Sequence, residues 1–313
     1  MRYKKLEKAG VEVSSLAIGT WAIGGDSYGK VNEKDSIEAI RTMIDNGVNI
    51  LDTASSYGAG HSEEVVGKAL KDGYRNKVLV ATKFGVPFFK DYENDGSYEN
   101  CIKECEGSMK RLGVDYLDFF LMHWPDPKTP LEEAMRALED LKKQGKIRFA
   151  GVSNFTKEQI IEAQKYVQID VIEPPYSMVN QSAKELMQWC AAQGIGSLTY
   201  GSLGAGILTG TIRELPKYDK DDMRYEFYDF FVEPKFSRVQ ELLKTLDVVA
   251  KAHNKPVAQV AINWSTQKDY VHAALCGVRN AAEALQNCQT FEWSLTEDEM
   301  KMIDAKLDEM QIG

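Results

Sequence analysis

Short apolar segments that alternate with amphipathic stretches constrain this sequence more than any other feature. Eight such segments are spaced a few tens of residues apart, and each is followed by at least one stretch with helical periodicity. They cover residues 13–19, 49–52, 78–83, 116–123, 147–152, 171–173, 195–200 and 271–276. Strands this short and apolar are typical of a parallel sheet that is buried on both faces. Eight strand–helix repeats that close on themselves form a TIM barrel, which is the fold we predict.

An open, doubly wound sheet is the alternative arrangement of the same elements. That fold normally carries G-x-G-x-x-G after its first strand. The first strand here leads into Gly19, Thr20 and Trp21, which do not match the motif. We therefore expect an α/β protein with a (β/α)8 barrel, a small N-terminal β-hairpin over residues 3–13 and extra helices. Barrels of this length commonly form one domain, so we expect a single domain over residues 1–313.

Capping residues mark several helix ends. Asn32 precedes one predicted helix, and two capping boxes, Thr156 with Gln159 and Thr296 with Glu299, precede others. Ser182 and Glu185 predict a further cap. Residues 215–234 are charged and aromatic, and we expect a long loop there, of a kind that is often functional.

Composition excludes several classes of partner. The net charge of −9 argues against a nucleic-acid or anionic-membrane surface, because either would need a basic patch. The five cysteines are scattered, and no histidine accompanies Cys101 and Cys105, the two at helical spacing, so we expect free thiols and no metal site. The N-terminus lacks the apolar core of a signal peptide, and no apolar run approaches the ~20 residues of a membrane span. We expect a soluble, cytoplasmic protein that is a monomer or small homo-oligomer.

Polar residues stand at the ends of three successive predicted strands. Asp52, Lys83 and His123 end the second, third and fourth strands, and Tyr57 follows Asp52 within a glycine-containing turn. The active site of a TIM barrel lies at the carboxyl ends of its strands. Adjacent strands are ~4.8 Å apart, so we expect these side chains to meet around the Tyr57 phenol.

This group of residues suits the reduction of a carbonyl. Tyr57 can donate a proton to the carbonyl oxygen, and a neighbouring Lys83 ammonium is expected to lower the pKa of Tyr57. Asp52 would hold Lys83 in place, and His123 would orient the substrate oxygen.

The motifs L-D-T-A-S-S-Y-G, A-T-K-F-G, L-M-H-W-P and G-V-S-N-F resemble those of the aldo-keto reductases. The resemblance runs over nearly the whole chain, and Y-G-S-L followed by I-L-T-G is most similar to a bacterial branch with a long loop after strand seven. It implies a (β/α)8 barrel that binds a nicotinamide cofactor across its mouth and reduces a small-molecule carbonyl or oxidises an alcohol. It makes Tyr57 the general acid/base and Asp52, Lys83 and His123 its partners.

The same resemblance assigns the cofactor site. Ser153 and Asn154 match residues that hold the carboxamide, Tyr200 matches the residue that stacks on the nicotinamide, and Gly201 to Gly206 match the pyrophosphate loop. The full set of cofactor-binding residues that it implies is Gly19, Thr20, Trp21, Asp52, Ser153, Asn154, Glu173, Tyr200, Gly201, Ser202, Leu203, Gly204, Gly206, Gly277, Arg279, Glu283 and Asn287.

Two positions depart from the family pattern. Glu173 stands where the family usually has a glutamine, and an ionised carboxylate cannot donate to the carboxamide oxygen. Glu283 stands where glutamine or arginine is common; its carboxylate would repel a 2′-phosphate and could accept from a 2′-hydroxyl. Arg279 can pair with a 2′-phosphate. We therefore expect NADP(H) to be favoured over NAD(H).

Aromatic residues supply the expected substrate pocket, which comprises Trp21, Tyr57, Phe88, His123 and Trp124. Further candidate walls are Tyr28, Phe89, Tyr225, Phe227, Tyr228 and Phe230. Such walls suit a hydrophobic or planar carbonyl. Two other functions stay open: a Schiff-base lyase that uses Lys83 as its nucleophile, and a cofactor-binding regulatory subunit.

Overall fold

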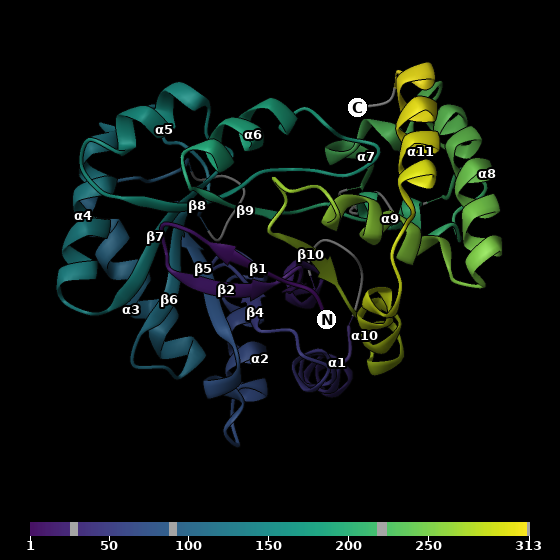
Figure 1. The fold of residues 1–313 in the computed structure, drawn as a ribbon. Helices are drawn as coiled ribbons and strands as arrows, with labels where there is room; N and C mark the ends of the chain where they lie inside the picture. The colour runs from purple at the N-terminus through teal and green to yellow at the C-terminus, as the bar shows by residue number, and fades with distance from the viewer. Residues whose placement is uncertain (26–30, 88–92, 218–223, 312–313) are drawn as a thin grey trace.

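The fold is that of a computed structural model, which describes residues 1–25, 31–87, 93–217 and 224–311. Eight parallel strands form a closed barrel in the order β10-β3-β4-β5-β6-β7-β8-β9, which confirms the predicted TIM barrel (Figure 1). The barrel strands are β3 (Leu16–Gly19), β4 (Ile50–Asp52), β5 (Leu79–Phe84), β6 (Leu117–Met122), β7 (Ile147–Ser153), β8 (Ile169–Glu173), β9 (Gly196–Thr199) and β10 (Ala273–Gly277).

The predicted hairpin closes the amino end of the barrel. It consists of β1 (Tyr3–Leu6) and β2 (Val11–Ser14), so Val13 belongs to the hairpin and not to the first barrel strand, where the sequence had placed it. Leu6 and Val13 pack with the inward-facing residues of the barrel in one buried cluster. A Cβ on Gly196 would lie 2.4 Å from Leu6 Cδ2, so the glycine in β9 makes room for this plug.

Helices surround the barrel. They are α1 (Glu33–Asp45), α2 (His61–Ala69), α3 (Tyr98–Leu112), α4 (Leu131–Lys143), α5 (Lys157–Ala163), α6 (Lys184–Ala192), α7 (Arg224–Phe227), α8 (Lys235–His253), α9 (Val257–Thr266), α10 (Ala281–Cys288) and α11 (Glu297–Met310). The extra helices α8 and α11 pack side by side outside the barrel (Figure 1).

Most predicted helix ends are confirmed. The Asn32 side chain caps α1, and capping boxes start α5 and α11. The predicted Ser182–Glu185 cap is wrong, because α6 begins after Ala183 without a side-chain cap, and Ser182 Oγ instead hydrogen-bonds Asn180 Oδ1 at 2.7 Å.

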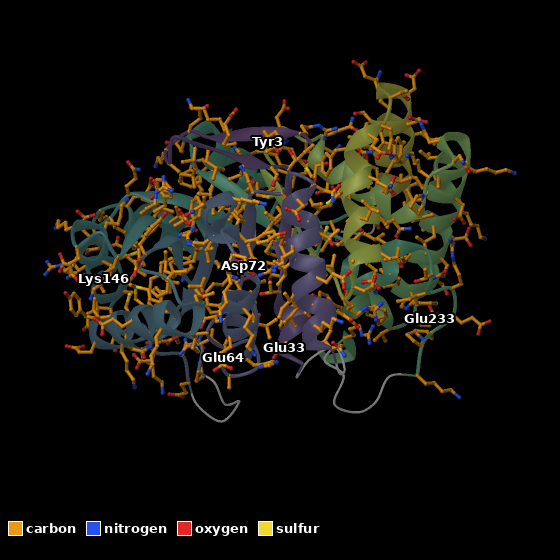
Figure 2. The ribbon with its side chains drawn as sticks, turned by 90° about the horizontal axis from the view of Figure 1, so that it is seen from below. Tyr3, Glu33, Glu64, Asp72, Lys146 and Glu233 are labelled. Carbon is orange, nitrogen blue, oxygen red and sulfur yellow. The ribbon has the colours of Figure 1, made fainter. Side chains whose placement is uncertain are left out.

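The two ends of the barrel are distinct. Tyr3 of the hairpin lies at one edge of the molecule in Figure 2, and Glu33 and Glu64, in the first turns of α1 and α2, lie at the opposite edge. The helices begin where the strands end, so the carboxyl ends of the strands face away from the plug. Within the described ranges, no helix combines the length and the apolar character that crossing a membrane requires.

The segment predicted as a loop, residues 215–234, contains ordered elements. Its described part includes α7 and a short 3-10 helix, η4 (Asp229–Phe231). Phe230 and Phe231 are buried and anchor η4 to the core. The segment is therefore packed where it meets the barrel.

Candidate active site

The turn after β4 brings Tyr57 to the carboxyl end of the barrel. Gly58 has φ +58°, and a Cβ there would lie 2.3 Å from the carbonyl oxygen of Gly24, so only glycine lets the two loops meet. The preceding 3-10 helix η1 (Trp21–Gly24) can therefore approach, and Trp21 stacks on Tyr57 with ring centroids 6.2 Å apart.

Lys83 of β5 lies beneath Tyr57 and is fully buried. Its Nζ donates to Asp52 Oδ1 at 2.6 Å and Oδ2 at 2.7 Å, and to the carbonyl oxygen of Thr53 at 2.9 Å. The Tyr57 hydroxyl is 3.4 Å from the same nitrogen. The inferred partnership of Asp52, Lys83 and Tyr57 agrees with this geometry.

A second carboxylate also contacts Lys83. Glu173 Oε1, at the end of β8, is 3.2 Å from Lys83 Nζ. Burial would lower the pKa of Lys83, but Asp52 and Glu173 together raise it, so the ammonium stays charged. The sequence suggested Asp52 as the partner of Lys83 but gave no sign that Glu173 would share it.

His123 completes the group from the end of β6. Its ring packs edge-on against Tyr57 with centroids 5.7 Å apart, and its Nδ1 is 3.5 Å from Ser56 Oγ. Burial lowers the pKa of His123, and Lys83 lowers it further. The imidazole is therefore neutral, and one ring nitrogen can donate a hydrogen bond while the other accepts.

Lys83 lowers the pKa of Tyr57, as expected, but burial outweighs this effect. Burial raises the pKa of Tyr57, and the Lys83 ammonium offsets only part of that rise. The cause is that a buried phenolate loses its hydration. Tyr57 is therefore a protonated phenol near neutral pH, the form that can give a proton to a substrate.

A cavity of about 960 Å³ opens above these residues. Among the described residues, every catalytic and cofactor-binding residue suggested above lines it, apart from Lys83 and Gly204, as does Trp124. Lys83 lies behind Asp52 and Tyr57 and acts through them. Gly204 is buried and does not line the cavity, and a Cβ there would lie 2.9 Å from Val179 Cγ2, so it shapes its loop. Its part in cofactor binding stays a prediction. Phe88 lies outside the described residues, as do Tyr28 and Phe89.

Hydrogen bonds fix the middle of the cavity. Ser153 Oγ donates to the carbonyl oxygen of Glu173 at 2.8 Å, and the Tyr200 hydroxyl donates to Asn154 Oδ1 at 2.8 Å. Asn154 Nδ2 donates to the carbonyl oxygen of His123 at 3.1 Å. This network ties the ends of β6, β7, β8 and β9 into one rigid wall.

A glycine-rich turn and the start of α10 form the far end of the cavity. Gly201, Ala205 and Gly206 line it with positive φ angles, a backbone arrangement that can direct amide groups toward an anion. Arg279 donates to Glu283 Oε1 through Nη2 at 3.1 Å and to Oε2 through its backbone nitrogen at 3.0 Å. The cation that was expected to bind a 2′-phosphate is therefore paired with a carboxylate.

The polar groups that line the cavity fit a dinucleotide. The cavity runs from the Tyr57 group past the glycine turn to Arg279, and Glu173 Oε2 in its wall is buried without a hydrogen-bond partner among the described residues. That oxygen can accept from an amide group of a ligand. Within the described ranges, no cluster of His, Cys, Asp and Glu residues has the arrangement of a metal site.

Several lining residues were not found from the sequence. They include Ser56, Asn94, Thr209, Thr211, Ile212, Arg224 and Gln286. Among the proposed aromatic walls, Trp124, Phe227 and Tyr228 line the cavity, and Phe227 packs edge-on against Trp21 with centroids 5.6 Å apart. Phe230 is buried behind them and is not part of the wall. The side chain of Tyr225 is not among those described.

Comparison with known proteins identifies this arrangement. The model of the Aldo/keto reductase family matches residues 15–308. Aldo-keto reductase YhdN of Bacillus subtilis (strain 168) is 35% identical over 98% of this chain and 94% of its own length. NADH-specific methylglyoxal reductase of Escherichia coli (strain K12) is 29% identical over 92% of each chain. The solved structure of a glycerol dehydrogenase from Gluconobacter oxydans has a TM-score of 0.87 and 34% identity, with 97% of this chain and 94% of that chain covered. These matches cover nearly the whole chain, including the barrel and the residues that line the cavity. The chain therefore belongs to the aldo/keto reductase family of NAD(P)H-dependent oxidoreductases.

Proposed function

We propose that Tyr57 is the general acid/base with which this enzyme reduces an aldehyde or ketone. The observation that carries the proposal is the position of the Tyr57 hydroxyl, 3.4 Å from the Lys83 ammonium and on the wall of the cavity. As negative charge develops on the substrate oxygen, Tyr57 donates its proton and Lys83 stabilises the phenolate that remains. In alcohol oxidation the phenolate takes the proton back. A nicotinamide bound in the cavity would supply or accept the hydride.

His123 orients the substrate in this proposal. Its neutral imidazole lies beside the Tyr57 ring and can donate a hydrogen bond to the same carbonyl oxygen. Trp21 and Trp124 line the cavity nearby and shield the reacting atoms from water. Small and planar carbonyls suit these walls.

We also propose that NADP(H) is favoured over NAD(H), because Arg279 stands where a 2′-phosphate would lie. The Arg279–Glu283 pair is exposed, with 68% and 36% of the two side chains accessible, and such pairs contribute only about 0.2–1 kcal/mol. A phosphate can therefore displace Glu283 from Arg279 at little cost. The Escherichia coli relative is named as NADH-specific, so cofactor preference varies among relatives of this chain.

The Schiff-base alternative gains no support from the geometry. A Schiff-base lysine must reach its substrate as a neutral amine. Lys83 does not line the cavity, and its ion pair with the Asp52 carboxylate keeps it charged.

The test is Tyr57→Phe. We expect NADPH and NADH to bind as in the wild type, measured by quenching of tryptophan fluorescence, and turnover of a carbonyl panel that includes methylglyoxal to fall by about 10²–10⁴-fold. Tyr74→Phe is the matched control, since Tyr74 bonds Asp45 at the surface and does not line the cavity. Wild-type turnover by Tyr57→Phe would show that another group moves the proton.

A further inference from the structure

Glu173 is a buried acid that the proposed proton transfer does not use. It ends β8, is 2% exposed and lines the cavity. One oxygen, Oε1, lies 3.2 Å from Lys83 Nζ, and the other, Oε2, is buried without a hydrogen-bond partner among the described residues. A carboxyl oxygen placed in a cavity wall without a partner is an acceptor available to a ligand.

The contacts of Lys83 decide which of its two acidic neighbours it can stabilise as a carboxylate. An ammonium group has three N–H bonds, and Asp52 and the carbonyl oxygen of Thr53 accept at the shortest distances, 2.6 to 2.9 Å. The contacts of Lys83 to Glu173 and Tyr57 are longer, and the two residues compete for the remaining hydrogen-bonding capacity of the ammonium group. Lys83 can therefore neutralise one carboxylate, and Glu173 is the one that it holds less closely.

Glu173 therefore keeps its proton when the cavity holds no cation. Burial raises the pKa of Glu173, and Asp52 raises it further, with Lys83 opposing both. Burial raises the pKa of Asp52 as well, but Lys83, which donates to both Asp52 oxygens, lowers it, so Glu173 is the acid that keeps the proton. The other groups that face the cluster are the phenols of Tyr57 and Tyr200 and the neutral His123, and none of them supplies a positive charge.

We propose that Glu173 makes this site prefer the oxidised nicotinamide, by releasing its proton when the positively charged ring binds. The inference rests on the proposed function, in which the ring lies beside Tyr57. Oxidised and reduced cofactors differ only in the ring, which carries a positive charge when oxidised and none when reduced. With Glu173 ionised, the group of Asp52, Lys83 and Glu173 has a net charge of −1, which attracts the oxidised ring alone. Glutamine, usual at this position in the family, cannot change its charge.

The proton balance follows from linkage. Binding of the oxidised cofactor converts the Glu173 carboxylic acid to a carboxylate and passes one proton to solvent, whereas the reduced cofactor leaves that proton in place. By reciprocity, raising the pH tightens the binding of the oxidised form relative to the reduced form. The adenosine and phosphate groups are common to both forms, so their own titration cancels in the ratio.

Two measurements on the whole protein test the proposal. Dissociation constants for NADP⁺ and NADPH are measured by fluorescence between about pH 5.5 and pH 9, the range in which buried glutamates ionise. For the wild type we expect the ratio Kd(NADPH)/Kd(NADP⁺) to rise on the order of tenfold to a hundredfold as the pH rises. Calorimetry in two buffers with different heats of ionisation should show that binding NADP⁺ releases up to about one proton more than binding NADPH.

Variants assign the proton to Glu173. Glu173→Gln should make the ratio independent of pH and remove the proton release. Glu283→Gln, the same change at the opposite end of the cavity, should leave both intact. Tyr57→Phe removes one of the two phenols that face the group and should still release the proton.

The outcomes separate the two proposals. A wild-type ratio that does not change with pH, or a proton release that persists in Glu173→Gln, overturns the role of Glu173 and leaves the carbonyl reductase proposal standing. A protein that binds neither cofactor overturns the reductase proposal itself. If Glu173→Gln fails to fold, the wild-type ratio still decides: a ratio that does not change with pH overturns the role of Glu173, and proton release by Tyr57→Phe excludes Tyr57 as the source of the proton.

Discussion

At the scale of single residues, one exposed ion pair marks the end of the cavity where we propose that the adenosine of the cofactor binds. Glu283 accepts from both the guanidinium and the backbone of Arg279, while the Asn280 side chain accepts from the backbone nitrogen of Glu283 at 2.9 Å. Glu283 is thus held in front of the cation by the cap of α10. In the proposed binding mode, a 2′-phosphate would have to pair with Arg279 in the presence of this carboxylate.

Removing the charge of Glu283 should change cofactor preference. We expect Glu283→Gln to tighten NADPH binding about three- to tenfold relative to NADH, because repulsion of the phosphate disappears while Arg279 remains. Arg279→Ala should weaken NADPH by about tenfold or more and change NADH little. Both effects should shrink at high salt, because the pair is exposed. Equal effects of Glu283→Gln on the two cofactors would mean that the 2′-position lies elsewhere.

At the scale of elements, buried aspartates join neighbouring barrel strands. Asp118 is the second residue of β6 and is fully buried. Its Oδ2 accepts from the backbone nitrogen of Val80 in β5 at 2.9 Å and lies 2.8 Å from Arg75, and its Oδ1 accepts from Arg148 of β7 at 2.7 Å. One carboxylate thereby links three consecutive strands.

Asp118→Ala should therefore destabilise the barrel. We expect a loss of about 2–4 kcal/mol in the free energy of unfolding, because the Val80 amide and the largely buried Arg75 lose their partner. Urea denaturation monitored by circular dichroism measures it. Asp115→Ala, three residues earlier at an exposed position, is the control and should cost less than about 0.5 kcal/mol. Equal costs for the two variants would rule out a special role for Asp118.

At the scale of the whole molecule, residues from both ends of the chain complete the barrel. β10 pairs with β3, and its pairing with β9 is short, limited to Ala273 with Leu198 and Ala274 with Thr199. His272 reinforces this seam, since its Nδ1 accepts from the backbone nitrogen of Ser197 at 3.1 Å. Because one closed barrel uses both ends, we propose that residues 1–313 act as one domain.

The seam should make the stability of the fold depend on pH. Burial lowers the pKa of His272 to about 4, and Lys4 adds to the shift. A histidine whose pKa is lower in the folded protein stabilises the fold fully at pH values above its unfolded-state pKa, near 6.5. This contribution is lost as the pH falls toward the folded-state pKa. Between about pH 7 and pH 5, the free energy of unfolding of the wild type should therefore fall by about 2 kcal/mol more than that of His272→Gln. Urea denaturation at both pH values measures this difference.

His61→Gln is the control for this experiment. His61 begins α2 at an exposed position, so its replacement should leave the pH dependence of the wild type in place. A His272→Gln variant that followed the wild-type curve would show that the acid sensitivity arises from other groups.

Local sequence patterns were enough to predict the barrel and the polar residues at the ends of its strands. Each strand is short and apolar because both of its faces are buried, and each polar residue at a strand end is visible beside its strand. Asp52, Lys83 and His123 could therefore be assigned to one rim before any distance was known. The caps at Asn32, Thr156 and Thr296 were equally visible, because a cap involves residues only three positions apart.

Tertiary structure alone decided the charges within the site and the far wall of the cavity. Glu173 reaches Lys83 across 90 positions in the chain, and only closure of the barrel brings them to 3.2 Å. The pKa of Tyr57 rises because burial outweighs a neighbouring ammonium, and burial is a property of the packed molecule. Gly204 belongs to the same glycine-rich loop as Gly201 and Gly206, and only the structure shows that it is buried and does not line the cavity. Sequence specifies which groups can react, while desolvation and distance, which depend on the whole fold, decide the charge each one carries.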